Sequence, residues 1–408
     1  MTGDQFIIGM DEVREAEKVL SSVVKKTPVE HSRTFSEISG NDVFLKLENL
    51  QTTGSFKIRG AYNKIYHLSE EEKKRGVVAS SAGNHAQGVA YAAKLLGTKA
   101  TIFMPIFTPP SKVVATEAYG AEVRLYGETY DDAFKKAIEF TNSNRMVFVH
   151  PFNDPYIIAG QATIGLEIYE QIKDIDAVVV PIGGGGLISG IAFALKSLKS
   201  DIKIIGVEAE GAQSMKKSVE KGEIVPLVNL NTIADGIAVK TPGPLTFEMV
   251  KVYVDDLVTV TDEEIADAMY MLLTRNKIVA EPAGAVSLAA ILSRKIEMKN
   301  KRVCAVISGG NVDYNLLTQI IQKGLMDEKL IIKVSLIIPD KPGSLKQILN
   351  FLSERQANVL DIHVDRVESD IPAGMARVII SVQTFGERNI RELENFLRMQ
   401  KINYELIY

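Results

Sequence analysis

Lys57 is the residue of this sequence best suited to covalent chemistry. It lies in the run SFKIRG at residues 55–60, between two apolar side chains and after a turn-like Gly-Ser pair. Most lysines are solvated surface charges, but apolar surroundings disfavour the charged form of an amine. Lowering its pKa from about 10.4 to about 7–8 corresponds to roughly 3–4 kcal/mol. Because a neutral amine attacks carbonyl carbons, this run indicates a lysine that forms a Schiff base.

A glycine run supplies a candidate anion site between a predicted strand and a predicted helix. Backbone N–H groups of glycines approach a ligand without Cβ clashes, and the helix N-terminus adds the positive end of a dipole, which typically binds phosphate. A dinucleotide site is the competing interpretation, because Glu208 ends the next predicted strand where a ribose-binding acid would lie. Neither the G-x-G-x-x-G spacing nor a P-loop lysine fits, so we favour a phosphate site. Its residues are Gly183, Gly184, Gly185, Gly186 and Leu187.

Two further polar runs follow predicted strands. SSAGNHA at residues 80–86 precedes a helix, where small residues suit an anion such as a carboxylate. Its Asn84 can donate or accept at a planar ligand, and we expect the backbone N–H of His85 to matter more than the imidazole. SGGN at residues 308–311 offers the Ser308 hydroxyl, which alternatively caps a helix. The candidate carboxylate-binding residues are Ser81, Ala82, Gly83, Asn84 and His85.

These runs fall at the junctions of an alternating strand and helix pattern. Such alternation predicts an α/β protein with parallel sheets covered on both faces. Gly97 and Gly120 stand just past two predicted helices, where a left-handed cap is favoured. The predicted strands are Val77–Ser80, Ala100–Met104, Glu122–Leu125, Met146–Val149, Ala177–Val180, Ile202–Glu208 and Val303–Ile307, and the predicted helices are Ala86–Leu96, Ser111–Tyr119, Tyr130–Asn142 and Leu187–Leu198.

The sequence changes character near residues 323–329, where charged residues cluster. The pattern beyond this point predicts a β-α-β-β-α-β order, the ferredoxin-like plan, so we place a domain boundary near Glu328. The strands Leu330–Ile338, Val359–Val367 and Met375–Thr384 and the helices Ser344–Arg355 and Ile390–Met399 belong to this plan.

Composition limits the classes of partner. The chain has 408 residues, which suits more than one domain, and its net charge of −4 gives no electrostatic footprint for nucleic acid. Cys304 is the single cysteine and lies in an apolar run, so it reads as a small buried side chain in a reducing compartment. Residues 1–10 lack the basic and apolar segments of a signal peptide. We expect a cytoplasmic protein without nucleic-acid or membrane partners.

Taken in order, the four runs resemble the fold-type II pyridoxal-phosphate enzymes over nearly all of residues 10–325. SFKIRGA, SSAGNHAQG, PIGGGGLISG and SGGN are similar to the threonine dehydratases (threonine ammonia-lyases) and to the related serine dehydratases and serine racemases. Residues 332–408 resemble an ACT regulatory domain. The resemblance implies a catalytic region at 1–328, in which a smaller subdomain at about 55–155 is inserted in the larger one, and an ACT domain at 329–408.

The resemblance assigns a role to each motif. Lys57 becomes the Schiff-base lysine for pyridoxal 5'-phosphate and takes the proton from the substrate Cα, and Phe56 is a cofactor-binding residue. Asn84 reaches the phenolic oxygen of the cofactor, and Ser308 bonds its pyridine nitrogen. The glycine run binds the phosphate through backbone amides, and the loop 81–85 receives the substrate carboxylate. The implied activity converts L-threonine, and L-serine, to 2-oxobutanoate or pyruvate with release of ammonia.

The resemblance leaves several alternatives. Serine racemases, β-replacement enzymes of the cysteine synthase type and a non-catalytic amino-acid sensor share the scaffold. Racemases carry a serine hydroxyl where this chain has Ala82, which favours the dehydratase. They also hold a cation beside a segment matching Glu208 and Ala212; Ser214 replaces the second acid here, so a cation site, such as one for a monovalent ion, stays open and no metal ligand is assigned. ACT domains imply a homo-oligomer, a dimer or a tetramer, and an amino-acid effector, for which isoleucine is the first candidate.

Overall fold

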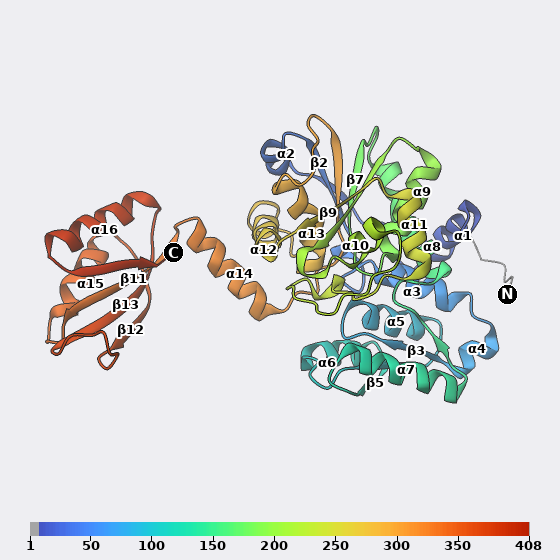
Figure 1. Ribbon diagram of the computed structural model, residues 1–408, viewed down its shortest axis with the longest axis horizontal. Coiled ribbons are helices and arrows are strands. Elements are labelled where there is room, and N and C mark those ends of the chain that lie inside the picture. Colours follow the sequence, from blue (N-terminus) through green and yellow to red (C-terminus); the bar gives the residue numbers. More distant parts are fainter. Residues whose placement is uncertain (1–7, 408) are drawn as a thin grey trace. The chain divides into compact units, whose positions relative to one another are not determined.

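A computed structural model describes residues 8–407 of the chain (Figure 1). Most of the segment considered for a targeting signal, residues 1–7, therefore lies outside the described residues. The chain divides into two compact units, one ending at Asp313 and the other beginning at Tyr314. This division precedes helix α14, Tyr314–Asp327, whereas the boundary near Glu328 that the sequence suggests follows the helix.

The first unit contains a large, mostly parallel sheet. In the described residues it has six strands in the order β1-β2-β10-β7-β8-β9, and the edge pair β1–β2 is antiparallel. The central strands β7, β8 and β10 are nearly all buried because helices cover both faces, whereas the edge strands β1 and β9 are partly exposed. They are β1 Val29–His31, β2 Asp42–Leu47, β7 Ala177–Pro181, β8 Lys203–Ala209, β9 Asp256–Val260 and β10 Arg302–Ile307.

Helices pack on the two faces of the large sheet. Val178 and Val306 point towards α8, α9 and α11 in one continuous core, and α13 packs on the other face against β7, β8, β9 and β10. Cys304 lies fully buried in the same core, which confirms its reading as a small buried side chain. The helices around this sheet are α1 Met10–Leu20, α2 Arg33–Ser39, α8 Pro155–Gln171, α9 Gly186–Leu198, α10 Ser214–Lys221, α11 Pro244–Tyr253, α12 Asp262–Met271 and α13 Pro282–Leu292.

A smaller parallel sheet is built from the chain between β2 and β7. Its four strands, counted in the described residues, have the order β5-β4-β3-β6. Val77 and Ala79 of β3 pack with α5, while Val78 packs with α7. The two helices therefore cover opposite faces of this sheet (Figure 1). The elements are α3 Lys57–Tyr66, α4 Glu70–Arg75, β3 Val77–Ser80, α5 Asn84–Leu95, β4 Ala100–Met104, α6 Pro110–Ala118, β5 Glu122–Leu125, α7 Tyr130–Asn144 and β6 Val147–Phe148.

The second unit has the ferredoxin-like order that the sequence predicts. Its strands pair antiparallel in the order β12-β13-β11-β14. Alternate residues of β11 and β13, such as Val334 and Ile380, are buried under α15 and α16, as expected for a sheet with one covered face. The elements after α14 are β11 Ile331–Pro339, α15 Ser344–Glu354, β12 Val359–Asp365, β13 Met375–Gln383, α16 Glu387–Met399 and β14 Asn403–Ile407.

One boundary differs from the sequence-based expectation in a way that matters for the site. We predicted a helix beginning at Ala86, but α5 begins at Asn84. The difference places the Asn84 side chain in the first turn of the helix rather than in the preceding loop. Glycine and asparagine favour loops in isolation, and here the buried surroundings of the helix override that local preference.

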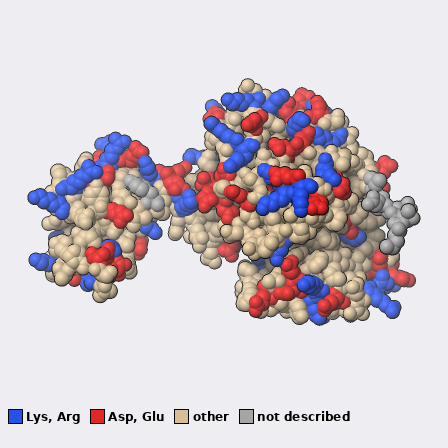
Figure 2. All heavy atoms as spheres, viewed as in Figure 1, with Lys and Arg blue, Asp and Glu red and all other residues tan. Residues whose placement is uncertain are grey.

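No helix among residues 8–407 is long and apolar enough to cross a bilayer. The uncharged stretch at residues 177–195 divides between β7 and α9, with the glycine run between them. On the face of the molecule drawn in Figure 2, acidic and basic side chains are interspersed.

Candidate active site

Two pairs of adjacent parallel strands bring the sequence motifs together. In the large sheet β7 and β10 are neighbours, and the chain leaves β7 through α9 to β8 on the opposite side. In the small sheet β3 and β6 are neighbours, and the chain leaves β3 through α5 to β4, on the side away from β6. The gap between the two neighbours is the switch point of each sheet. Ligands of open parallel sheets bind at such points, beyond the carboxyl ends of the strands. The glycine run follows β7, SGGN follows β10 and the loop 81–85 follows β3, so all three lie at these points.

Lys57 is the first residue of α3 and is partly buried. Its Nζ donates a hydrogen bond of 3.1 Å to the carbonyl oxygen of Pro151, and it lies 5.1 Å from the centroid of the Phe56 ring. Burial lowers the pKa of the Lys57 amine to about 8, against the opposing attraction of the Glu281 carboxylate. An amine with this pKa is available as a nucleophile or a base near neutral pH.

Backbone pairing joins the lysine motif to the SGGN motif. Ser55 and Gly309 form an antiparallel bridge, and the Phe56 N–H donates to the carbonyl oxygen of Ser308 at 3.2 Å. The Ser308 hydroxyl donates to the carbonyl oxygen of Ala283 at 3.3 Å, in the first turn of α13. These bonds fix the start of α3 against the carboxyl end of β10, although the two motifs lie at opposite ends of the first unit in sequence.

The glycine run forms a cradle with no room for side chains. A Cβ on Gly184 would lie 2.2 Å from the ring of Phe152, and a Cβ on Gly186 would lie 2.9 Å from the Phe152 Cα. Gly185 has a φ of 93°, which L-residues with side chains rarely adopt. The run leads directly into α9, whose first N–H groups have no partner within the helix. The cradle therefore presents amide donors and a positive dipole end to an anion.

In the segment 81–85, which ends in the first turn of α5, side chains bond the protein's own backbone. The Ser81 hydroxyl accepts a hydrogen bond of 3.2 Å from the Gly83 N–H. The His85 Nε2 lies 2.8 Å from the carbonyl oxygen of Val149, so this nitrogen carries the proton and donates. Burial, reinforced by the charge of Lys57, lowers the pKa of His85 to about 3. A neutral imidazole held by a backbone carbonyl supports our expectation that the His85 side chain is not the base.

A second histidine, His150, borders the site and was not identified from the sequence. Its Nδ1 accepts from the backbone N–H groups of Phe152 at 3.2 Å and Asn153 at 2.9 Å, so the proton lies on Nε2. Burial lowers the pKa of His150 to about 4, and the charge of Lys57 acts in the same direction. Its position just after β6, the strand beside β3 at the switch point of the small sheet, is the signal that could have identified it from the sequence.

The structure also adds a buried acid, Glu281. Its Oε1 accepts a hydrogen bond of 2.6 Å from the Nδ2 of Asn84, whose Oδ1 accepts one of 2.7 Å from the Nδ2 of Asn311. Burial raises the pKa of Glu281 to about 7, and the charge of Asp235 raises it further, while Asn84 opposes the shift. The sequence signal was an acid directly before Pro282 at the start of an apolar helix, a position for a helix N-cap.

The Glu208 segment, matched above to a cation site, is filled by protein contacts. The two carboxylate oxygens of Glu208 accept from the backbone N–H groups of Met215 at 2.9 Å and Lys216 at 2.8 Å, at the start of α10. Ser214 donates to the carbonyl oxygen of Val239 at 2.8 Å. Within residues 8–407 no three His, Cys, Asp or Glu side chains lie close enough together to hold a metal ion.

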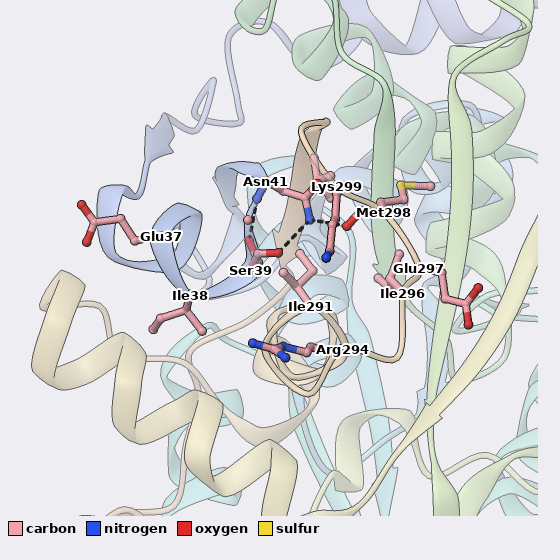
Figure 3. Close-up of a pocket in the computed structure, with 12 residues that line it drawn as sticks. Glu37, Ile38, Ser39, Asn41, Ile291, Arg294, Ile296, Glu297, Met298 and Lys299 are labelled. Atoms are coloured by element: carbon pink, nitrogen blue, oxygen red, sulfur yellow. Dashed lines mark hydrogen bonds between the residues drawn. The ribbon is translucent and has the colours of Figure 1, made fainter.

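A pocket of about 670 Å³ lies at the opposite end of the large-sheet strands from the candidate site (Figure 3). Asn41 and Lys299 of its lining stand before β2 and β10, which are parallel, so the pocket is at the amino ends of these strands. Figure 3 shows Glu37 and Glu297 directed away from its centre. The residues predicted for the site do not line this pocket, which is therefore not the candidate active site.

The sequence matches known proteins over most of its length. Residues 20–309 match the family described as pyridoxal-phosphate dependent enzyme. The L-threonine ammonia-lyase of Thermotoga maritima is 50% identical over 391 residues, covering 96% of this chain and 97% of that protein. The catabolic L-threonine dehydratase of Escherichia coli is 47% identical over 315 residues, covering 77% of this chain and 96% of its own length.

Solved structures show the same relationship. The processed form of threonine deaminase isoform 2 from Solanum lycopersicum aligns with a TM-score of 0.73 and 38% identity, over 79% of this chain and 98% of that chain. Maize serine racemase aligns with a TM-score of 0.74 and 38% identity, over 79% of this chain and 100% of that chain. The backbone alone therefore does not separate a deaminase from a racemase.

Proposed function

The chain belongs to the family of pyridoxal-phosphate dependent enzymes, and from this premise we propose that it deaminates L-threonine, and L-serine as a second substrate. The products are ammonia with 2-oxobutanoate or pyruvate. The observation that carries the proposal is the 50% identity to an L-threonine ammonia-lyase over 96% of this chain. The geometry supports it, because Lys57 bonds the carbonyl oxygen of Pro151, the next residue Phe152 packs against the glycine cradle, and an amine and an anion site joined in this way suit a carbonyl cofactor that carries a phosphate.

The residues present fit pyridoxal 5'-phosphate. A Cβ at any of the four glycines of the cradle would meet neighbouring protein atoms, so only glycines fit there, and a run without side chains leaves its backbone amides uncovered for an anion. The amine of Lys57 has a pKa of about 8, and burial is the cause. Ser80 has a fully buried hydroxyl without a hydrogen-bond partner among the described residues, as expected beside a polar ligand. The residues that would hold the cofactor are Phe56, Lys57, Asn84, Gly183, Gly184, Gly185, Gly186, Leu187 and Ser308.

The chain's own groups have distinct tasks in the reaction. When bound, the cofactor supplies the electron sink for the charge left when the substrate Cα–H bond breaks. The amine of Lys57 receives that proton. The neutral hydroxyl of Ser308 lacks the negative charge that would keep the pyridine nitrogen protonated. Loss of the β-hydroxyl then releases an enamine, which water converts to the 2-oxoacid and ammonia.

The loop before α5 would bind the substrate carboxylate. Its N–H groups lie at the start of a helix, where the dipole favours negative charge. His85 contributes its backbone, because its imidazole is neutral and bonded to Val149. The substrate-binding residues in this proposal are Ser81, Ala82, Gly83, Asn84 and His85.

Serine racemisation is the second candidate, favoured by the alignment to maize serine racemase. Racemisation needs an acid–base group on each face of a planar carbanion, and Lys57 supplies one. The methyl group of Ala82 cannot supply the other, and the hydroxyl of Ser81, one residue earlier, is turned towards the N–H of Gly83. We therefore place deamination first. β-Replacement of the cysteine synthase type is tested by sulfide-dependent cysteine formation from an acetylated serine.

The test uses the purified holoenzyme with each L-hydroxy amino acid in turn. We expect release of 2-oxobutanoate from L-threonine and of pyruvate from L-serine, and loss of both in Lys57→Ala. An intact, cofactor-loaded enzyme that releases no 2-oxoacid would contradict the proposal. An absorbance band of the lysine-bound cofactor without any turnover would instead favour the amino-acid sensor.

We propose that residues 1–328 form the catalytic region, with a smaller subdomain at about 55–155, and that residues 329–408 form an ACT regulatory domain. The ferredoxin-like order of the second unit supports the latter. The catabolic dehydratase of Escherichia coli matches 77% of this chain but 96% of its own length, so a shorter chain contains the matched region. We also propose that the enzyme is a homo-oligomer, a dimer or a tetramer, in the cytoplasm, without nucleic-acid or membrane partners.

Isoleucine is the proposed effector of the C-terminal domain. Effector and substrate affinities must change by the same factor, because binding linkage is reciprocal. We expect isoleucine to raise the threonine concentration at half-saturation in the full chain, and truncation after Glu328 to remove this response while the reaction remains. A full isoleucine response in the truncated enzyme would refute the assignment. Light scattering of both forms tests the oligomer.

A further inference from the structure

We propose that Glu281 and Asn311 are positioning residues that lock the Asn84 side chain as a hydrogen-bond donor towards the phenolic oxygen of the cofactor. The inference rests on the proposed function, since that function places the cofactor beside Asn84. It adds two residues, from α13 and from the SGGN run, that act through Asn84. It also decides which way the Asn84 amide faces.

Asn311 fixes the oxygen of the Asn84 amide. Its Nδ2 donates to the carbonyl oxygen of Thr53 at 2.9 Å and to the Oδ1 of Asn84 at 2.7 Å. A backbone carbonyl can only accept, so the Asn311 atom facing Thr53 must be the nitrogen. Both hydrogens of that nitrogen are then used, and the Asn84 atom facing it must be the oxygen.

Glu281 engages the other end of the Asn84 amide. Its Oε1 lies 2.6 Å from the Asn84 Nδ2 and accepts one of the two hydrogens on that nitrogen. With its oxygen already bonded to Asn311, Asn84 has one N–H left to offer a ligand. The two partners fix the orientation of the amide, with the oxygen turned to Asn311 and the nitrogen keeping one N–H for a planar ligand, which removes the ambiguity left by the sequence. A donor at the phenolic oxygen favours the ionised form of that oxygen.

Two glycines make room for this network. A Cβ on Gly309 would lie 2.0 Å from the Oε1 of Glu281, and a Cβ on Gly54 would lie 2.4 Å from the Oδ1 of Asn311. The Glu281 N–H also donates to the Gly309 carbonyl oxygen at 3.0 Å. The packing therefore holds both partners of Asn84 in place, and side chains at these two glycines would displace them.

Glu281 brings a titratable charge to Asn84. It is 5% exposed, and burial raises its pKa to about 7. Asp235 of the turn Asp235–Ile237 raises the pKa further, whereas Asn84, Lys112 of α6 and Lys57 of α3 lower it. As pH rises through about 7 the carboxyl loses its proton and pulls more strongly on the Asn84 amide. The ionisation of the phenolic oxygen should follow this change.

The experiment is an absorbance titration of the holoenzyme, because the spectrum of the lysine-bound cofactor reports the ionisation of its phenolic oxygen. We expect the unmodified enzyme to show a component near pH 7. Glu281→Gln keeps an acceptor for Asn84 but removes the charge, so it should bind cofactor and lose that component. Asn311→Asp cannot donate to Asn84 and should shift the midpoint of the cofactor titration upward by about one pH unit, the equivalent of one hydrogen bond to the charged form.

Matched controls separate this role from a general effect of buried substitutions. Glu208→Gln changes another acid with a raised pKa of about 7, and its carboxylate bonds Met215 and Lys216 rather than Asn84. Asn63→Asp changes a buried amide that donates to Tyr156. Both should leave the titration of the cofactor unchanged. Thermal unfolding of each apo-protein shows which variants fold. If Asn311→Asp does not fold, Asn311→Ala takes its place in the titration.

The outcomes distinguish the inference from the function on which it rests. If Glu281→Gln and the Asn311 variants carry cofactor with the unmodified titration, the positioning role is wrong and the proposed function stands. The same holds if the controls shift the titration as much. If the unmodified enzyme shows no absorbance band that depends on Lys57, both are overturned.

Discussion

The Nζ of Lys57 lies 3.1 Å from the carbonyl oxygen of Pro151. Lys57 begins α3, and Pro151 follows β6 at the switch point of the small sheet. A carbonyl accepts from a neutral amine as well as from an ammonium group, although the charged donor bonds more strongly, so this bond can persist when the lysine loses its proton. Burial meanwhile lowers the pKa of Lys57 to about 8. The fold thus holds the amine in place while favouring its reactive form.

Lys57→Ala should abolish the absorbance of the lysine-bound cofactor and lower kcat for threonine by at least about 100-fold, since a positioned base contributes at least that much. Borohydride reduction of the unmodified holoenzyme, followed by peptide mapping, should recover the cofactor on Lys57. Label on another lysine would refute the assignment. Unchanged thermal unfolding of the apo-variant serves as the control for folding.

Recombination of the apo-protein with pyridoxal 5'-phosphate should speed up as pH rises towards about 8 and then level off, because only the neutral amine of Lys57 attacks. The stability of the apo-protein should depend on the same titration of Lys57. The folded state loses the Lys57 proton near pH 8 and the unfolded state near 10.5, so the free energy of unfolding of the apo-protein should rise between these values. Lys57→Met should lack this rise. Stopped-flow absorbance and urea unfolding measure the two effects.

Gly184→Ala should weaken cofactor binding about tenfold or more, because the added methyl group would lie 2.2 Å from the Phe152 ring and force it or the cradle to move. Phe152→Ala in the same chain should recover part of the loss, and Phe152→Ala alone shows the effect of the missing ring. Equilibrium dialysis against pyridoxal 5'-phosphate gives the affinities. Equal binding by Gly184→Ala and the unmodified protein would contradict the steric argument.

Arg59→Met should destabilise the protein by about 3–5 kcal/mol, because it leaves the buried carboxylate of Glu48 without the cation that bonds it. Arg59 is fully buried and bonds Glu48 at 2.8 Å and Glu167 at 2.7 Å. Burial alone would raise the pKa of Glu48, but the Arg59 charge outweighs it and lowers the pKa. This stabilisation should therefore be lost as pH falls below the ordinary value of 4.5. Denaturant unfolding measures both effects. Arg33→Met, which removes an exposed pair with Glu37, should cost less than about 1 kcal/mol.

The unmodified enzyme should convert L-serine to pyruvate with little D-serine, and Ala82→Ser should raise the D-serine share. The reason is the missing proton donor on the second face of the carbanion, which a hydroxyl at position 82 would supply. Chiral chromatography alongside a pyruvate assay measures both products. Comparable amounts of D-serine and pyruvate from the unmodified enzyme would overturn this reading of Ala82.

The strand-following motifs could be found from sequence because their signals are local. Lys57, the glycine run and Ser308 each stand next to a turn, a strand end or a helix start, and these features are written in neighbouring residues. Glu281 could not be found in this way. Its partner Asn84 is 197 positions away, and its burial arises only when α13 packs beside the small subdomain. His150 is a different case, since its partners Phe152 and Asn153 are neighbours in sequence, and its position just after β6 was a local signal that could have been used.

Strand β2 shows a different limit of sequence reasoning. Lys46 interrupts its apolar residues, so Asp42–Leu47 does not read as a central strand of a parallel sheet. In the structure Lys46 is fully buried and bonds Glu167 at 2.5 Å, from α8. A charge is tolerated in the core when a partner of opposite sign is buried with it. That partner is more than a hundred positions away in the sequence, so no local pattern predicts the pair.

The pairing of β2 with β10 means that the large sheet can be completed only late in translation. The two strands come from opposite ends of the first unit, and Val43 lies opposite Val303 in their register. During translation Lys57 leaves the ribosome early, whereas Ser308, whose carbonyl oxygen holds the Phe56 N–H, leaves when the unit is almost complete. A nascent chain that ends before β10 therefore carries its lysine without the support that fixes α3. We therefore expect capture of the cofactor only after β10 has left the ribosome, at the last stage of synthesis of this unit and before the second unit is complete.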